Sequence, residues 1–232
     1  SRAAAPKAGR LAGGMWPFTK KDKPYLRSSS MAAAAKARAS GDFKKAIAEY
    51  QKVIEQEPDN TDVHGKLAPL LAQAQQYKQA WKSFEICADG FKKKGFVDKA
   101  ISVYAQASDF LPGLPDVWER MAALHLERLR KPDAVKVLLK GRTYFKTREY
   151  RPDAIRLLSR ARELEPNNLE MCLDLASLLR LSGRRAEGLA VLTPLLPGQR
   201  GKQLRRLRGS LWRLQPTPAR LWHYLRALLL GR

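Results

Sequence analysis

Three stretches of the chain repeat one pattern of apolar and polar positions at a constant spacing of 54 residues. Residues 43–58 are FKKAIAEYQKVIEQEP, residues 97–112 are VDKAISVYAQASDFLP, and residues 151–166 are RPDAIRLLSRARELEP. Apolar side chains of the first stretch recur at i, i+3, i+4 and i+7, which predicts an amphipathic helix that the closing proline ends. Self-similarity at a constant period is typical of stacked helical repeats, in which each unit buries its apolar face against its neighbours.

A second helix is predicted after each of these stretches, beginning near residues 61, 116 and 170 with an acidic side chain in its first turn. Its recurring small residues at the 54-residue period are Ala68, Ala122 and Ala176. Small side chains at these positions let neighbouring helices approach closely. Pro69 interrupts the first copy, and we expect it to kink the helix or end it early because proline lacks a backbone donor.

The other helical patterns cover residues 28–40, 77–93, 132–145 and 185–196. The chain is therefore predicted to hold about ten antiparallel helices within residues 28–197. Residues 198–232 form a different part, with two short, basic amphipathic helices joined at Pro216-Thr217-Pro218. Residues 1–27 lack periodicity and are predicted to be a flexible basic segment. Within that segment, Met15-Trp16-Pro17-Phe18 is either a short docking or membrane-touching element, or part of a tail with an upstream extension ahead of a start at Met15.

Residues 28–60 carry the pattern of a known family. Gly41-Asp42-Phe43, Ala46, Tyr50 and Pro58 lie where tetratricopeptide repeats have a Gly-Asp-aromatic turn, a small residue, an aromatic residue and a closing proline. Residues 114–145 and 168–196 resemble the same repeat. The resemblance covers about residues 28–197 and implies an all-α, right-handed helical-repeat solenoid that binds other proteins.

The repeat departs from this family in its period. The small residues that open the second helix of each pair are Ala46, Ala80, Ala100, Ala134, Ala154 and Gly188. Their separations alternate between 34 and 20 residues, whereas a simple array would keep about 34 throughout. The repeating unit is therefore predicted to contain three helices, so that some helices end one pair and begin the next.

Composition adds an uneven distribution of charge. The 232 residues carry a formal net charge of +22, of which residues 1–40 contribute +8 and residues 188–232 contribute +9 with no acid. The two ends are therefore basic and the repeats are nearly balanced. No apolar run is long enough for a transmembrane helix. Cys87 and Cys172 stand alone on predicted helices and are expected to be buried thiols in a reducing compartment.

Catalytic chemistry is not expected. His64, His125 and His223 are far apart in sequence and have no metal-ligand spacing, and no phosphate loop or nucleophile motif is present. We therefore predict no enzyme activity, cofactor, metal or small-molecule substrate.

Two groups of side chains are candidate sites. By family position, the partner-binding groove would hold Lys82, Glu85, Asp89, Lys92 and Lys93 on one helix, and Asp116 and Glu119 on another. Their mixed charges favour a protein segment over a polyanion, although a plain solvated face would have the same composition. The second group, for an anionic surface or phosphates, is Arg205, Arg206, Arg208, Arg213, Trp212 and Trp222.

Three interpretations of the tail remain open. It caps the last helix of the stack, lies on an anionic membrane, or contacts nucleic acid through its arginines. We predict a cytoplasmic, non-catalytic scaffold that binds partner proteins through its repeat surface, and that is peripheral at a membrane if the tail binds one. The alternative is a nucleic-acid- or ribosome-associated basic protein.

Overall fold

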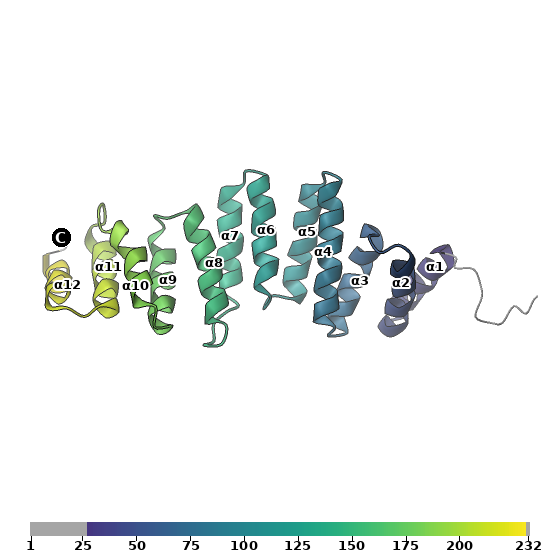
Figure 1. The fold of residues 1–232 in the computed structure, drawn as a ribbon, viewed down its shortest axis with the longest axis horizontal. Helices are drawn as coiled ribbons and strands as arrows, with labels where there is room; N and C mark the ends of the chain where they lie inside the picture. The colour runs from purple at the N-terminus through teal and green to yellow at the C-terminus, as the bar shows by residue number, and fades with distance from the viewer. Residues whose placement is uncertain (1–26, 231–232) are drawn as a thin grey trace, which may run out of the picture.

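Helices joined by short turns make up the computed structural model, which describes residues 27–230 (Figure 1). Twelve α-helices lie in these residues: α1 (Arg27–Ala39), α2 (Phe43–Gln56), α3 (Thr61–Gln73), α4 (Tyr77–Lys93), α5 (Val97–Phe110), α6 (Pro115–Glu127), α7 (Lys131–Arg142), α8 (Arg151–Leu164), α9 (Leu169–Leu181), α10 (Arg185–Leu192), α11 (Gly201–Leu214) and α12 (Pro218–Leu230). A 3-10 turn, η1 (Thr193–Leu195), follows α10. The predicted segment 1–27 lies outside the described residues except for Arg27.

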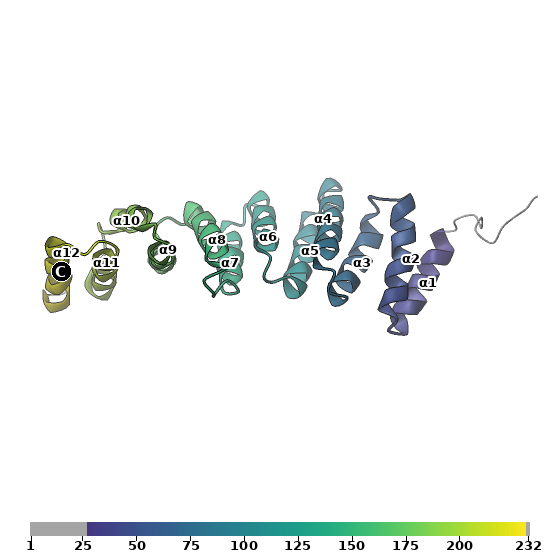
Figure 2. The ribbon, with the colours of Figure 1, turned by 60° about the horizontal axis from the view of Figure 1, so that its bottom comes forward.

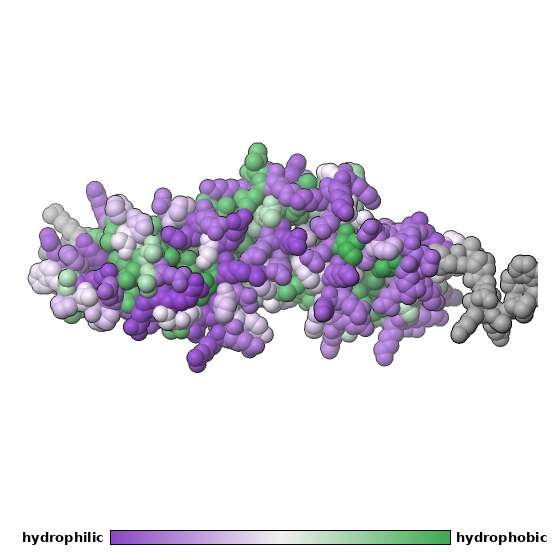
Figure 3. All heavy atoms as spheres, in the orientation of Figure 1, coloured by the Kyte–Doolittle hydropathy of each residue, from purple (hydrophilic) through white to green (hydrophobic). Residues whose placement is uncertain are grey.

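The helices run in alternating directions along one elongated stack, from α1 at one end to α12 at the other (Figures 1 and 2). Each helix packs against the next, and no strand occurs in residues 27–230. The prediction of an all-α repeat fold with ten helices ahead of a helical tail is confirmed. The face shown in Figure 3 is largely covered by hydrophilic side chains, with apolar groups between them.

Side-chain caps and prolines set the helix starts that the repeat requires. Asp42, Asn60 and Asn168 each accept a hydrogen bond from the backbone N–H three residues ahead, at 3.0, 3.1 and 3.3 Å. Such bonds satisfy donors that the first turn of a helix leaves without partners. Helices α6, α7 and α8 instead place a proline in the first turn, where its missing N–H costs little.

One predicted boundary is wrong, and at Pro69 one of the two predicted outcomes, an early helix end, does not occur. Helix α3 continues through Pro69 to Gln73, because the residues beyond the proline, Leu70 and Leu71, are buried and hold the last turn in the core. Helix α7 ends at Arg142, so Phe145 is not on the helix. Phe145 is nevertheless 1% exposed, since the turn after α7 folds its ring back into the core.

Contacts between helices two apart show the three-helix unit directly. Besides contacts between successive helices, α3 contacts α5, α6 contacts α8, and α9 contacts α11. These pairs recur every third helix. Helix α11 therefore stands to α9 as α5 stands to α3, and the repeat continues into the basic tail.

Helix α11 is packed into the main core by its leucine stripe. Leu207 is 0% exposed, Leu204, Leu211 and Leu214 are also buried, and three of the four belong to the same apolar cluster as Leu175 of α9. Gly188 of α10 makes this approach close, because a Cβ there would lie 2.6 Å from Leu214 Cδ2. The apolar side of α11 is thus used inside the protein.

The two cysteines should not react while the chain is folded. Both are buried, and burial raises the pKa of the Cys87 thiol to about 11 and also raises that of Cys172. At pH 8 only about 0.1% of Cys87 would be thiolate, the reactive form. We expect Ellman's reagent to label neither thiol quickly in buffer and both in urea. Rapid reaction of two thiols in the native protein would contradict this packing.

Candidate functional site

The predicted groove residues on α4 and α6 do not form one site. Lys82 is exposed on α4, and Lys92 Nζ donates to Glu127 Oε1 at 2.6 Å. Lys93 lines a cavity that does not include Glu85. That cavity, of about 830 Å³, also contains Arg27, Asp62 and Asp89 and lies beside the turn between α2 and α3. The structure brings together the acidic members of the set and separates the lysines.

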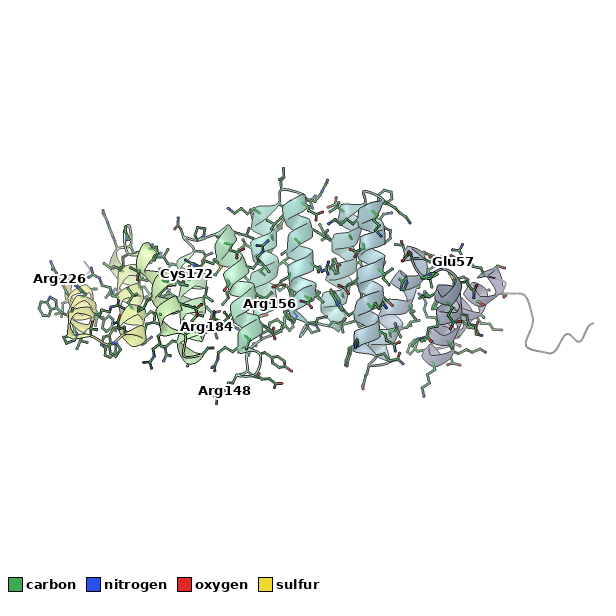
Figure 4. All side chains as sticks on the ribbon, in the orientation of Figure 1. Glu57, Arg148, Arg156, Cys172, Arg184 and Arg226 are labelled. Atoms are coloured by element: carbon green, nitrogen blue, oxygen red, sulfur yellow. The ribbon has the colours of Figure 1, made fainter. Side chains whose placement is uncertain are left out.

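Three of the predicted carboxylates are paired with an arginine from the helix two further along the chain. Glu85 Oε1 accepts from Arg120 Nη2 at 3.2 Å. Arg156 of α8, in the middle of the stack in Figure 4, bonds Asp116 at 2.6 Å and Glu119 at 2.9 Å. Because each arginine joins helices two apart in the chain, these charges are used in part to hold the stack together.

Burial raises the pKa of Glu85, and Asp89 and Asp116 add to this shift while Arg120 opposes it. The half-buried Glu85 carboxylate is thus already desolvated and paired within the protein.

A basic pocket lies at the other end of the stack, between α9, α11 and α12. It encloses about 680 Å³, and we call it the C-terminal pocket. Its lining residues are Glu170, Leu173, Asp174, Ser177, Lys202, Arg205, Arg206, Gly209, Ser210, Arg213, Tyr224 and Leu228. It holds three of the four arginines predicted for an anionic ligand.

Two of these arginines are available to a ligand. Arg206 is occupied, since it forms a two-point pair with Glu170 in which Nη2 lies 2.7 Å from Oε2. This hydrogen bonding lowers the pKa of Glu170. Asp174 is held by Arg142 of α7, at 3.0 Å. Arg205 and Arg213 form no ion pair within residues 27–230.

The remaining tail residues lie elsewhere. Arg208 donates from Nη1 to the carbonyl of His223 at 3.2 Å and lines a separate cavity of about 430 Å³ with Arg220. Trp212 stacks on Tyr224 of α12, with ring centroids 6.3 Å apart and planes 5° apart. Trp222 is 65% exposed. The two tryptophans therefore do not share a surface role, because Trp212 joins α11 to α12.

Sequence reasoning missed the partners of the predicted charges, above all Arg120, Arg156 and Glu170. A signal was present, because the paired residues are 35, 40 and 36 positions apart. These separations are close to one tetratricopeptide repeat of about 34 residues. Opposite charges about one repeat apart could therefore have been expected to meet between helices two apart in the chain.

Within residues 27–230, no group of three or more His, Cys, Asp or Glu side chains is arranged to hold a metal ion. No helix in the same part of the chain has the length and apolar character needed to cross a membrane. His64 Nε2 lies 2.7 Å from the carbonyl of Pro58, which is a structural contact at a helix start.

Comparison with known proteins identifies the repeat. Residues 37–82 match a family model described as tetratricopeptide repeat, and no curated protein matches the chain. Solved structures with some likeness include a tetratricopeptide repeat protein from Parabacteroides merdae, with 15% identity, 89% of this chain and 93% of that chain covered, and a TM-score of 0.29. The pilF protein of Pseudomonas aeruginosa gives the same four values.

A third structure is a thermophilic tetratricopeptide repeat protein of Thermus thermophilus, with 15% identity, 88% of this chain and 100% of that chain covered, and a TM-score of 0.26. Superpositions this poor say nothing about what the present chain binds. The family match, the cap and packing residues of the repeat, and the antiparallel helix pairs agree with one another. Residues 37–82 therefore contain a tetratricopeptide repeat, within a longer stack of antiparallel helices.

Proposed function

We propose that the chain is a non-catalytic scaffold that binds an acidic segment of a partner protein in the C-terminal pocket. Tetratricopeptide repeats bind other proteins and are typically not catalytic. The observation that carries the proposal is the pair of guanidinium groups, Arg205 and Arg213, that face a concave pocket without an acidic partner in residues 27–230. Lys202 adds a third positive charge to the same wall.

The pocket wall also contains apolar groups, which suit a peptide better than a nucleic acid. Leu173, Tyr224 and Leu228 can contact a hydrophobic side chain beside the acidic ones. Glu170 and Asp174 lie in the same wall, and their carboxylates would repel the closely spaced phosphates of RNA or DNA. An acidic peptide with one apolar residue can avoid them and still reach the arginines.

Reversing the two unpaired charges should remove most of the binding. We expect Arg205→Glu/Arg213→Glu to weaken the binding of a labelled peptide of alternating glutamate and leucine by about 10-fold or more, because the charges that attract the peptide would then repel it. Fluorescence anisotropy at about 0.15 M salt limits long-range effects of net charge. Arg148→Glu/Arg185→Glu is the matched control, because both arginines are exposed outside the pocket, as Figure 4 shows for Arg148.

A third variant tests the pocket in the opposite direction. Glu170→Gln removes a carboxylate from the wall and releases Arg206, so it should strengthen binding of the same peptide. Equal weakening by the pocket and control variants would show that only net charge matters. Tight binding of a single-stranded RNA of the same charge, lost in the pocket variant, with no peptide binding, would favour the nucleic-acid alternative.

A further inference from the structure

Helix α12 has a second apolar side that nothing covers in residues 27–230. Its packed side faces α11, with Ala227 fully buried and Tyr224 stacked on Trp212. The next side of the helix carries exposed apolar residues, which we call the α12 face: Leu221, Trp222, Leu225, Leu228 and Leu229. At about 100° per residue, the two sides together span roughly 200° of the helix. A helix at the surface of a protein needs only about 100°.

This wide apolar arc is that of an inner helix of the stack. The 13-residue helix α12 aligns without gaps on the 13-residue helix α9, 49 positions earlier. Leu221, Leu225 and Leu228 then correspond to Cys172, Ala176 and Leu179, all of which are buried. In the three-helix unit, α12 follows α11 as α9 follows α8.

The internal repeat also shows what kind of element covers such a side. Helices α3, α6 and α9 are each packed against the helix that follows, namely α4, α7 and α10. Gly188 of α10 lies so close to α9 that a Cβ there would be 3.4 Å from the carbonyl oxygen of Ala176. The element that fits against the α12 face is therefore an α-helix with its own apolar stripe.

Charge indicates the composition of that helix. The α12 face adjoins the C-terminal pocket through Leu228, so Arg205 and Arg213 lie along one border. Arg226 lies on the polar side of α12, at the C-terminal end of the stack in Figure 4. Residues 188–232 contain nine basic residues and no acid. A second copy of this chain would bring these like charges together, whereas an acidic helix would be attracted.

We propose that an acidic amphipathic helix of a partner protein docks on the α12 face, in the position that α10 occupies on α9. This rests on the function proposed above, and it gives the acidic segment a helical conformation and a second, apolar contact. The leucines anchor the helix, and the pocket arginines bind its acidic edge. The docking is the helix-in-groove mode of recognition, in which apolar anchors recur at helical spacing.

The test compares two synthetic peptides of identical composition. The first peptide has leucine at i, i+3, i+4 and i+7, glutamate at the other positions and a proline at each end, so it can form an amphipathic helix. The second has the same residues in scrambled order, with the prolines in its interior, so it cannot. We expect the helical peptide to bind about 10-fold more tightly or better. Leu221→Ser/Leu225→Ser should abolish that preference, whereas Leu129→Ser/Leu181→Ser, which alters exposed leucines elsewhere, should keep it. Circular dichroism of each variant checks that the stack is folded.

The outcomes separate this inference from the function on which it rests. If both peptides bind equally and only Arg205→Glu/Arg213→Glu weakens them, the pocket function stands and helix docking is wrong. If neither peptide binds, both are wrong. Two further results, each without peptide binding, would overturn the inference in favour of another occupant. The first is sedimentation of the protein with phosphatidylserine vesicles, and the second is a dimer detected by light scattering. Each counts only if Leu221→Ser/Leu225→Ser abolishes it.

Discussion

Replacing Trp118 by alanine should lower the free energy of unfolding by about 3–5 kcal/mol. The indole is fully buried, and its Nε1–H donates to the carbonyl of Pro112 at 3.0 Å. Its ring stacks on Tyr144, with centroids 5.4 Å apart. Gly141 leaves no spare room, because a Cβ there would lie 2.4 Å from Trp118 Cγ. Alanine would leave a cavity that these tightly placed neighbours cannot fill, and a part-buried carbonyl without its donor.

Urea denaturation followed by circular dichroism measures this loss. Trp222→Ala is the matched control, since the same side chain is 65% exposed there and its removal should change stability by no more than about 0.5 kcal/mol. Repeat proteins can unfold in parts, so hydrogen exchange should show the loss first in α6 and α7. If the two substitutions lowered the free energy of unfolding by similar amounts, the tight packing of Trp118 would not contribute to stability.

Leu207→Ala should cost about 2–5 kcal/mol, although it lies in the basic tail. Leu207 is 0% exposed and belongs to the cluster that includes Leu175 and Leu192 of α9 and α10. Its removal opens a cavity between helices and weakens the attachment of α11. If the tail were not packed on the stack and served only to bind a membrane or nucleic acid, this substitution would leave the stability unchanged.

The control for Leu207 is Leu229→Ala, because Leu229 is 84% exposed on α12. Thermal unfolding of both variants gives the comparison, with little expected change for Leu229→Ala. If Leu207→Ala also left the transition unchanged, α11 would be a detachable segment and the three-helix unit would end at α10.

The repeat pattern was sufficient to predict the fold, because the residues that pack between helices recur at constant spacing in the sequence. Helix α4 has the predicted bounds, Tyr77–Lys93, since its apolar spacing and flanking turns agree. The predictions of an early helix end at Pro69 and of Phe145 on α7 were wrong because burial outweighs local helix propensity. The extent of burial is known only once the neighbouring helices are placed. The division of the chain at residues 197 and 198 stays a prediction.

The candidate sites could be predicted less well, because charges meet across helices. The leucine stripe of α11 was consistent with a cap, a membrane contact or a nucleic-acid arm. Its burial against α9 and α10 is seen only once the helices are packed. The register that pairs Glu85 with Arg120 and leaves Arg205 and Arg213 unpaired likewise depends on how the helices are stacked. The sequence shows which residues are charged, and the packing decides which remain available.

Each repeating unit contains three helices, which is an odd number. Because successive helices are antiparallel, equivalent helices in successive units point in opposite directions. The turns that close with Pro58 and Pro166 lie along one long edge of the stack, and the equivalent turn with Pro112 lies along the opposite edge (Figure 1). Successive units therefore run in opposite directions across the stack and are not related by simple translation. A turn copied every 54 residues alternates between the two edges, and only turns 108 residues apart lie on the same edge. The packing residues can therefore recur in every unit, while the turns along the two edges are free to differ in sequence.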